Sequence, residues 1–473
     1  MLQFGDFFYE VPKSLMALNA TSVYFVIFCF IVFLLSRPFD SILRPYILFI
    51  ANIIFVYSFG LSNLIWLLGI SLLAYVLGII NDKYHNKYIV LCSSLIFGVG
   101  LFGFKLLNIN DSNIVIPLGL SFYTFKIISY LCDIYYEKCK CEYNPLYFLD
   151  YVMFFPCITA GPINRADYFL RELRSKHDFD YRDIASGFFL VACGLFEKLV
   201  FCDFVGSVVS KCLDNSELFG LNVLLGVVLY SFQIYLDFDS YSNIAIGVSR
   251  MLGFKLGKNF KVPYLSTSIK DFWSRWHISL SSWLKDYIYI PLGGSKKGVL
   301  RKYLNILIVF LVSGLWHGVV LNYLIWGIGH GVLRIIEDLI SLPFKNVELN
   351  KFGKFIISIP LICLNFIIVT TLWIFFKYDF NSAMVIINRI FVSSSLDFEL
   401  IGLTHNEVLW LGCVIGVTII CDIFRYFFDM AEFMGKRIFI LRYAVYVVLI
   451  VTFLVFGMYG GSFDSNDFIY RWF

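Results

Sequence analysis

Residues 354–376 read KFIISIPLICLNFIIVTTLWIFF, and this apolar run decides the fold class of the chain. A helix of about 20 apolar residues crosses the roughly 30 Å hydrocarbon core of a bilayer. The runs Leu15–Leu35, Leu43–Phe59 and Ile65–Ile80 reach or approach that length. Only helices and closed barrels satisfy their backbone hydrogen bonds in lipid, and barrel strands are far shorter than these runs. The sequence therefore predicts an all-α polytopic membrane protein.

Composition agrees with that prediction. The chain has 473 residues, of which 59% are hydrophobic and 15% charged, whereas soluble domains carry about 25% charged residues. The first apolar run is too long for a cleaved signal peptide and has no basic residues before its start except Lys13. Candidate spanning helices begin near residues 15, 43, 61, 88, 115, 184, 219, 303, 323, 355, 407 and 440.

Positive charge is concentrated in one block. Lys255–Lys302 contains ten Lys or Arg residues but only two acidic residues, Asp271 and Asp286. Such a block is typical of a cytoplasmic surface or of a site for an anionic ligand. The loops at Lys105–Asn113 and Ser394–Asn406 have few basic residues and are predicted to lie outside, as is the N-terminus. No nucleic-acid-binding signature is present, so nucleic acid is not an expected partner.

The segment Leu146–Pro162 is apolar but is not expected to cross the membrane completely. Pro156, Gly161 and Pro162 interrupt a helix, and the charge pattern of the neighbouring loops needs both ends on one side. We therefore predict a re-entrant or interfacial segment there.

The most informative single residue is His317, in the sequence SGLWHG of residues 313–318. The surrounding stretch Tyr303–Val320 is otherwise almost free of titratable groups. Hydrocarbon offers an imidazole no hydrogen bonds, so a histidine at this depth has a partner or a function. A packed structural histidine bonded to a neighbouring carbonyl is the alternative.

A second segment, residues 273–287, reads WSRWHISLSSWLKDY and is predicted to form a helix. Its i,i+4 spacing pairs Asp271 with Arg275 and Trp273 with His277. Three Trp residues suit a membrane interface, so an anchoring helix is one interpretation. His277 and the turn that follows favour a second one, the wall of a polar cavity.

The two histidines suggest proton-transfer chemistry. His277 and His317 are close enough in sequence to enter one cavity from opposite sides, and a neutral imidazole can take the proton of an acceptor hydroxyl during acyl transfer. No GxSxG nucleophile elbow or phosphate-binding GxxxxGK[ST] loop occurs. The pair Cys139 and Cys141 suits neither zinc nor a redox CxxC site, so no metal is predicted.

At these residues the chain resembles the membrane-bound O-acyltransferase family, and within it the branch of bacterial alginate O-acetyltransferases. The resemblance rests on ordered sequence blocks at Pro117–Phe125, Phe155–Pro162, Tyr235–Phe238, Asn259–Phe260, Pro263–Ser266, Trp273–Tyr287, Pro291–Gly294 and Leu315–Gly318.

That resemblance implies a single membrane domain over residues 1–473. It implies a ring of about 11–12 transmembrane helices around a central cavity or tunnel, with a catalytic core at about 115–331 and flanking helices at 1–114 and 332–473. His317 matches the catalytic histidine of the family, and His277 matches a second functional position. On the topology predicted above, His317 lies near the outer end of its helix and His277 near the inner face, an arrangement that favours a tunnel.

The resemblance also implies a reaction: transfer of an acetyl group from cytoplasmic acetyl-CoA, with no bound cofactor, to an exported polysaccharide or cell-wall glycan. A periplasmic or extracellular partner acetyltransferase and membrane lipid are the other expected partners, and the cell inner membrane is the expected location. The candidate donor and substrate pocket comprises Asn259, Trp273, Arg275, Trp276, Ser279, Trp283, Lys285, Asp286, Tyr287 and Trp316.

Two alternatives remain open at the level of sequence: D-alanyl or other acyl transfer to a cell-wall polymer or lipid, and a non-enzymatic glycan or lipid transporter. One departure from the family concerns residues 237–243, DFDSYSN, where the family commonly has DFSGYSD. Asp237 and Asp239 are candidates for orienting a histidine or for hydrating a helix end. His330 is a candidate for lining the same cavity or for packing against its neighbouring glycines.

Overall fold

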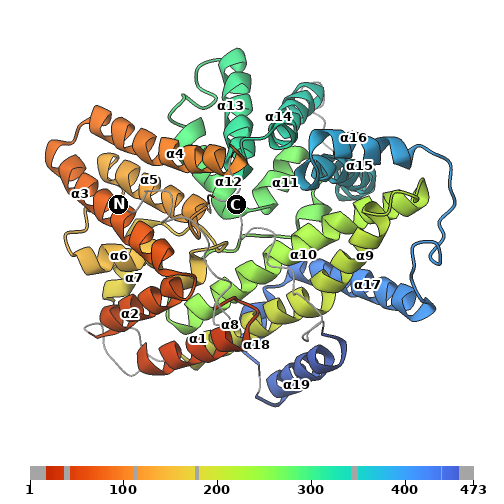
Figure 1. Cartoon of the computed structure of the whole chain (residues 1–473), viewed down its shortest axis with the longest axis horizontal. Helices are drawn as coiled ribbons and strands as arrows, with labels where there is room; N and C mark the ends of the chain where they lie inside the picture. The colour runs from red at the N-terminus through yellow and green to blue at the C-terminus, as the bar shows by residue number, and fades with distance from the viewer. Residues whose placement is uncertain are drawn as a thin grey trace.

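The computed structural model of the chain describes residues 18–36, 43–110, 114, 116–175, 180–341, 350–437 and 439–457. Within these residues the fold consists of α-helices, two short 3-10 helices and two π-helical turns, with no β-strand (Figure 1). The prediction of an all-α polytopic membrane protein is confirmed.

The helices in the first half of the chain are α1 (Val23–Ser36), α2 (Arg44–Tyr57), α3 (Leu61–Tyr84), α4 (Lys87–Asn110), α5 (Leu120–Tyr135), α6 (Pro145–Met153), η1 (Phe155–Cys157), α7 (Ala166–Arg174), α8 (Tyr181–Phe196), η2 (Glu197–Cys202), α9 (Asp203–Leu213) and α10 (Leu221–Met251). Those in the second half are η3 (Pro263–Leu265), α11 (Ile269–Arg275), α12 (Ile278–Leu284), η4 (Lys285–Tyr289), α13 (Val299–His317), α14 (Leu321–Ser341), α15 (Lys351–Lys377), α16 (Phe380–Ile390), α17 (His405–Phe427), α18 (Met430–Gly435) and α19 (Phe439–Phe456).

Six helices in the described part of the chain are long and apolar enough to cross a membrane: α3, α4, α10, α13, α15 and α17. The shorter apolar helices α1, α2 and α19 fall below that length. The remaining three predicted spans correspond to α5, α8 and α14, which are also helical. The predicted start near residue 15 lies outside the described residues. Each span predicted from hydropathy therefore corresponds to a helix in the structure.

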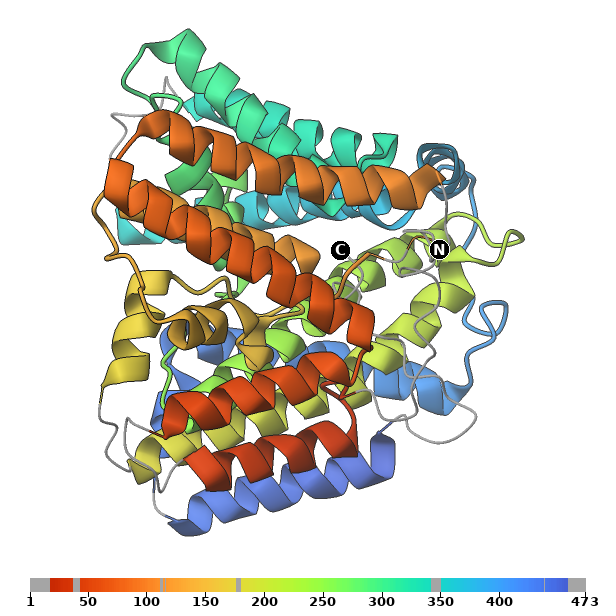
Figure 2. The ribbon, with the colours of Figure 1, turned by 60° about the vertical axis from the view of Figure 1, so that its left-hand side comes forward.

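Helix α10 lies at the centre of the molecule, and α8 packs along it (Figure 1). The approach is close because glycines face each other: a Cβ built on Gly247 would lie 2.5 Å from the carbonyl oxygen of Gly187. Small residues let helix backbones come together in membranes, where packing and not water exclusion holds helices to one another. On the opposite side of the molecule, α3 and α4 run as a hairpin pair beside α13 (Figure 2).

The segment predicted to be re-entrant is broken as expected. Helix α6 has nine residues and a rise of about 14 Å, which is too short to cross a bilayer. The chain turns at Phe154, and the amide of Phe155 then donates to Asn52 Oδ1 at 2.9 Å. Asn52 Nδ2 donates in turn to Asp150 at 2.9 Å. These bonds supply polar partners inside the protein for the backbone of a buried turn.

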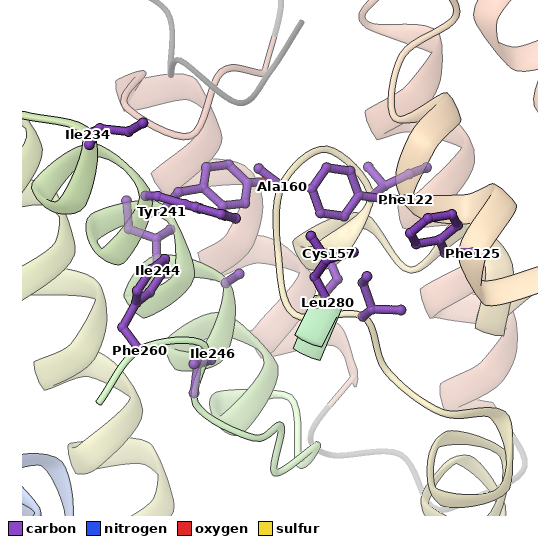
Figure 3. Packing of buried hydrophobic residues seen from close by; sticks show 14 of the residues in the cluster. Phe122, Phe125, Cys157, Ala160, Ile234, Tyr241, Ile244, Ile246, Phe260 and Leu280 are labelled. Carbon is purple, nitrogen blue, oxygen red and sulfur yellow. The ribbon is translucent and has the colours of Figure 1, made fainter. Parts of the chain in front are cut away.

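Aromatic and aliphatic side chains from α5, η1 and α10 fill the space between these elements. Figure 3 shows Phe122 and Phe125 of α5 facing Cys157 and Leu280 across the packed core, with Tyr241 and Ile244 on the α10 side. This packing fixes α5 and α12, which carry parts of the candidate site, against the central helix.

Asp237 and Asp239 lie in the middle of α10 and take part in ion pairs, so the helix-end role considered for them is wrong. Lys198 Nζ lies 2.7 Å from Asp237 and 3.0 Å from Asp203. Arg425 lies 2.6 Å from Asp239. Because removing one partner of a buried pair leaves the other charge uncompensated, such pairs tie their helices together.

The α8–α10 contact yields a prediction about stability. Gly247→Ala places a methyl group against the Gly187 carbonyl, and we expect such overpacking to lower the free energy of unfolding by about 1–3 kcal/mol. Thermal unfolding of the detergent-purified protein measures the effect. Gly69→Ala is the matched control, since a Cβ on Gly69 meets no atom within 4 Å. Equal unfolding midpoints for the two variants would contradict this account of the packing.

Candidate active site

The segment predicted as one helix over residues 273–287 is broken at His277. Helix α11 ends at Arg275, Trp276 is extended, and His277 adopts a left-handed conformation with φ 41° and ψ 56° before α12 begins. The predicted i,i+4 contact of Trp273 with His277 is therefore wrong, because the two residues do not share a helical turn. The predicted pair Asp271 and Arg275 does form, at 2.8 Å.

Asn259 holds the left-handed turn in place. Its carbonyl oxygen accepts the amide of Ile278 at 2.9 Å. Its side-chain oxygen accepts both the amide of Ser279, at 3.2 Å, and the hydroxyl of Ser279, at 2.7 Å. A residue with a Cβ is uncommon at positive φ, so neighbouring contacts must fix the conformation. Asn259 and Ser279 thus orient His277 from outside the site.

The imidazole of His277 is enclosed by aromatic rings. Its centroid lies 4.6 Å from that of Phe238, 6.5 Å from Phe122 and 6.0 Å from Trp316. The residue is 1% exposed and lies between helices that are not membrane-spanning. Burial lowers the pKa of His277 to about 3, so the ring is neutral near pH 7 and one of its nitrogens can accept a proton.

His317 is the last residue of α13, and its side chain points into the protein. It is 4% exposed, and its ring centroid lies 4.7 Å from that of Trp316, 5.0 Å from Trp326 and 4.9 Å from Phe376. The surrounding rings exclude lipid and water from this imidazole. A lipid-facing His317 would have ruled out the predicted role.

Trp316 joins the two histidines, because its fully buried indole contacts both imidazole rings. The two histidines thus meet at one side chain, in agreement with the expectation that they enter one cavity. The break after α11 turns His277 toward the end of α13. Both proton-accepting side chains consequently occupy one small aromatic compartment.

Lys105 is a site residue that the sequence interpretation missed. The sequence predicts that it lies in an outer loop, but α4 continues to Asn110 and Lys105 is only 3% exposed. Its ammonium group donates to the carbonyl oxygen of Trp316 and lies 3.4 Å from that of His317. A cation at a helix C-terminus satisfies its last carbonyls and complements its dipole. A lone Lys within the apolar run of α4 was the available signal.

His330 belongs to the neighbouring aromatic cluster. Trp273 Nε1 donates to His330 Nδ1 at 3.3 Å, and both rings pack on Trp326. Trp276 packs on Trp373, with ring centroids 5.0 Å apart. Of the candidate pocket residues, Trp273 and Trp276 therefore form the support behind the two histidines.

A cavity of about 650 Å³ lies on the other side of Phe260 and Asn259, between α8, α10, α17 and α18. Phe260 packs on Phe238, which packs on His277, so one aromatic layer separates the cavity from the imidazole. Its charged lining residues are Glu197, Asp239, Arg250, Lys258, Lys261, Asp422, Arg425 and Asp429. Arg275 reaches its edge, with the guanidinium 5.5 Å from the ring of Tyr426.

The structure places the other candidate residues away from the histidines. Trp283 stacks on Phe125 at 3.9 Å and donates to its carbonyl at 2.9 Å. Asp286 pairs with Arg165 at 3.0 Å. Tyr287 donates to Asp133 at 2.8 Å, and Lys285 is exposed. These contacts link α12 and η4 to α5 and α7.

Comparison with known proteins now gives the chain a family. Residues 141–378, half of the chain, match MBOAT, the membrane-bound O-acyltransferase family. The chain belongs to this family. The matched region contains His277, Trp316 and His317, whereas Lys105 and the α17 wall of the cavity lie outside it.

This MBOAT protein is similar in sequence to several bacterial acyltransferases. A probable alginate O-acetylase of Pseudomonas aeruginosa is 34% identical over 301 residues, 62% of this chain and 56% of the relative. A peptidoglycan O-acetyltransferase of Helicobacter pylori is 32% identical over 395 residues, 73% of each chain. A teichoic acid D-alanyltransferase of Bacillus subtilis is 30% identical over 277 residues, 54% of this chain and 69% of the relative. The chain spans 52–61% of the length of the alginate relatives that it matches.

The contact between Lys105 and the end of α13 yields a second prediction. Lys105→Met leaves the buried carbonyls of Trp316 and His317 without this donor, and each such loss costs about 1–3 kcal/mol. We expect a lower unfolding midpoint in detergent, with partial recovery in Lys105→Arg, which keeps a cationic donor. Lys87→Met, at an exposed position at the start of α4, is the control. A Lys105→Met protein as stable as this control would refute the capping role.

Proposed function

We propose that this MBOAT protein is a membrane O-acyltransferase that moves an acetyl group from acetyl-CoA to a hydroxyl of an exported glycan, or to a partner acetyltransferase that modifies it. The observation that carries the proposal is the pair of buried imidazoles, His277 and His317, against one indole in the region that matches the family. Such a pair supplies proton transfer in a site from which water is excluded.

His317 is the proposed general base. The acceptor hydroxyl gives its proton to the imidazole as its oxygen attacks the thioester carbon, and the departing thiolate takes the proton back. Trp326 and Phe376 shield the ring, which limits competing hydrolysis. His277, fixed by Asn259, is the proposed positioning or relay partner. A covalent acyl relay through an enzyme side chain would use the same residues and would give ping-pong kinetics.

The cavity behind His277 is the proposed entry for the donor. Arg250, Lys258 and Lys261 line it and belong to, or directly precede, the basic block of the sequence. Cationic side chains of this kind bind phosphate groups. The cavity is not lined by Lys285, Lys296 or Lys297. The proposed phosphate-binding residues are therefore only those between positions 250 and 261.

The acceptor class rests on the relatives. Their names specify alginate, peptidoglycan and teichoic acid, all of them polymers of the bacterial cell surface or envelope. An exported or cell-wall glycan is therefore the proposed acceptor, and the cytoplasmic membrane is the proposed location. Transfer of D-alanine in place of acetate is the alternative, since teichoic acid D-alanyltransferases are among the relatives.

Substitution of His317 tests the proposal directly. Membrane vesicles containing the full chain are supplied with acetyl-CoA, and the release of free CoA thiol is measured. We expect His317→Gln to lose on the order of 10²–10⁴-fold in turnover, the usual contribution of a general base. His405→Gln, at an exposed position at the start of α17, is the matched control and should retain wild-type turnover.

Each outcome has a distinct meaning. Turnover that persists in folded His317→Gln protein would remove His317 from the mechanism. Absence of turnover with acetyl-CoA, together with release of D-alanine from its carrier thioester, would replace the proposed donor. A protein that turns over neither donor while moving glycan or lipid across the vesicle would instead be a transporter.

A further inference from the structure

The indole N–H group of Trp316 is buried without a hydrogen-bond acceptor among the described residues. The side chain is fully buried. Among the described residues, Nε1 has no nitrogen or oxygen acceptor within hydrogen-bonding distance. A buried donor without an acceptor costs about 1–3 kcal/mol, and native structures retain few of them. Its retention beside two histidines requires a physical reason.

Other indoles in this protein show how a structural tryptophan is satisfied. Trp66 Nε1 donates to the hydroxyl of Tyr123 at 2.9 Å, and Trp283 Nε1 donates to the carbonyl of Phe125 at 2.9 Å. Trp273 Nε1 has His330 as its acceptor. Trp326 and Trp373 Nε1, like Trp316 Nε1, have no acceptor among the described residues. The ring of Trp316 contacts both His277 and His317, which places its N–H group beside the proposed reaction centre.

The indole of Trp316 is held rigidly. Its ring packs on Phe125 and Phe122, with ring centroids 5.6 Å away in each case. Its backbone carbonyl is bonded by Lys105, whose ammonium also lies 5.8 Å from the ring centroid. A donor fixed before the reaction stabilises developing charge without paying for reorganisation during it. The nearby ammonium adds positive potential at the same place.

We propose that Trp316 Nε1–H is the donor that stabilises the oxyanion of the acyl-transfer transition state. This inference rests on the proposed O-acyltransferase function. As the acceptor oxygen bonds to the thioester carbon, the π electrons of the carbonyl move to its oxygen, which accepts the indole hydrogen bond. The hydroxyl proton passes to His317. When the oxyanion collapses, the C–S bond breaks, and the CoA thiolate takes the proton from the imidazolium.

The sharpest test removes the N–H and keeps the ring. Replacing Trp316 by 3-benzothienylalanine substitutes sulfur for the N–H group with nearly the same shape. In vesicles supplied with acetyl-CoA, we expect kcat to fall on the order of 10²-fold, as for loss of one oxyanion donor, with KM changed by less than about twofold. The unfolding midpoint should stay the same or rise, because the resting protein loses no hydrogen bond.

The same replacement at Trp66 is the matched control. There the N–H has an acceptor, Tyr123, so we expect a lower unfolding midpoint with kcat within about threefold of wild type.

The outcomes separate this inference from the function on which it rests. If wild-type protein turns over acetyl-CoA and the Trp316 replacement does too, the inference is overturned and the function stands. A loss of stability at Trp316 that matches the loss at Trp66 overturns it as well. Wild-type protein without acyl turnover overturns the proposed function, and this inference with it.

Discussion

The end of α13 is the point on which the arrangement of the site depends. A helix that stops inside the protein leaves its last carbonyl groups without water, and each needs a donor from another part of the chain. Lys105 of α4 supplies that donor to Trp316 and His317. The ammonium is in turn stabilised by the negative end of the helix. One contact thus joins an early helix to the region that matches the family and fixes the end of the helix that carries the imidazole.

The position of His277, the second histidine, is set by a turn in the backbone. His277 occupies a left-handed turn, which costs roughly 1–2 kcal/mol for a residue with a Cβ and persists because Asn259 bonds the backbone on its C-terminal side. The break allows α11 and α12 to diverge and turns the imidazole toward Trp316. A continuous helix would have pointed this side chain in another direction. The strained conformation of His277 therefore brings its imidazole close to that of His317.

The two histidines and the neighbouring cavity come from different parts of the sequence. Both histidines lie within residues 141–378, which match the family, whereas α17 and α18 supply one cavity wall from beyond that region. Arg425 of α17 bridges Glu197 and Asp239 and so fastens this wall to the core. Asp239, which the resemblance singles out in the sequence, is therefore paired with a helix outside the region that matches the family.

The sequence by itself determined the helical membrane fold, the break in the apolar segment at 146–162, and the candidacy of His277 and His317, because hydropathy, helix-breaking residues and charge are local properties of a chain. Tertiary structure decided the rest. Asp237 and Asp239 became ion-pair partners, Lys105 moved from a presumed loop into the core, and Trp283 and Tyr287 turned away from the histidines. Those outcomes depend on which helices meet, and contacts between residues far apart in sequence leave no periodic signal along it.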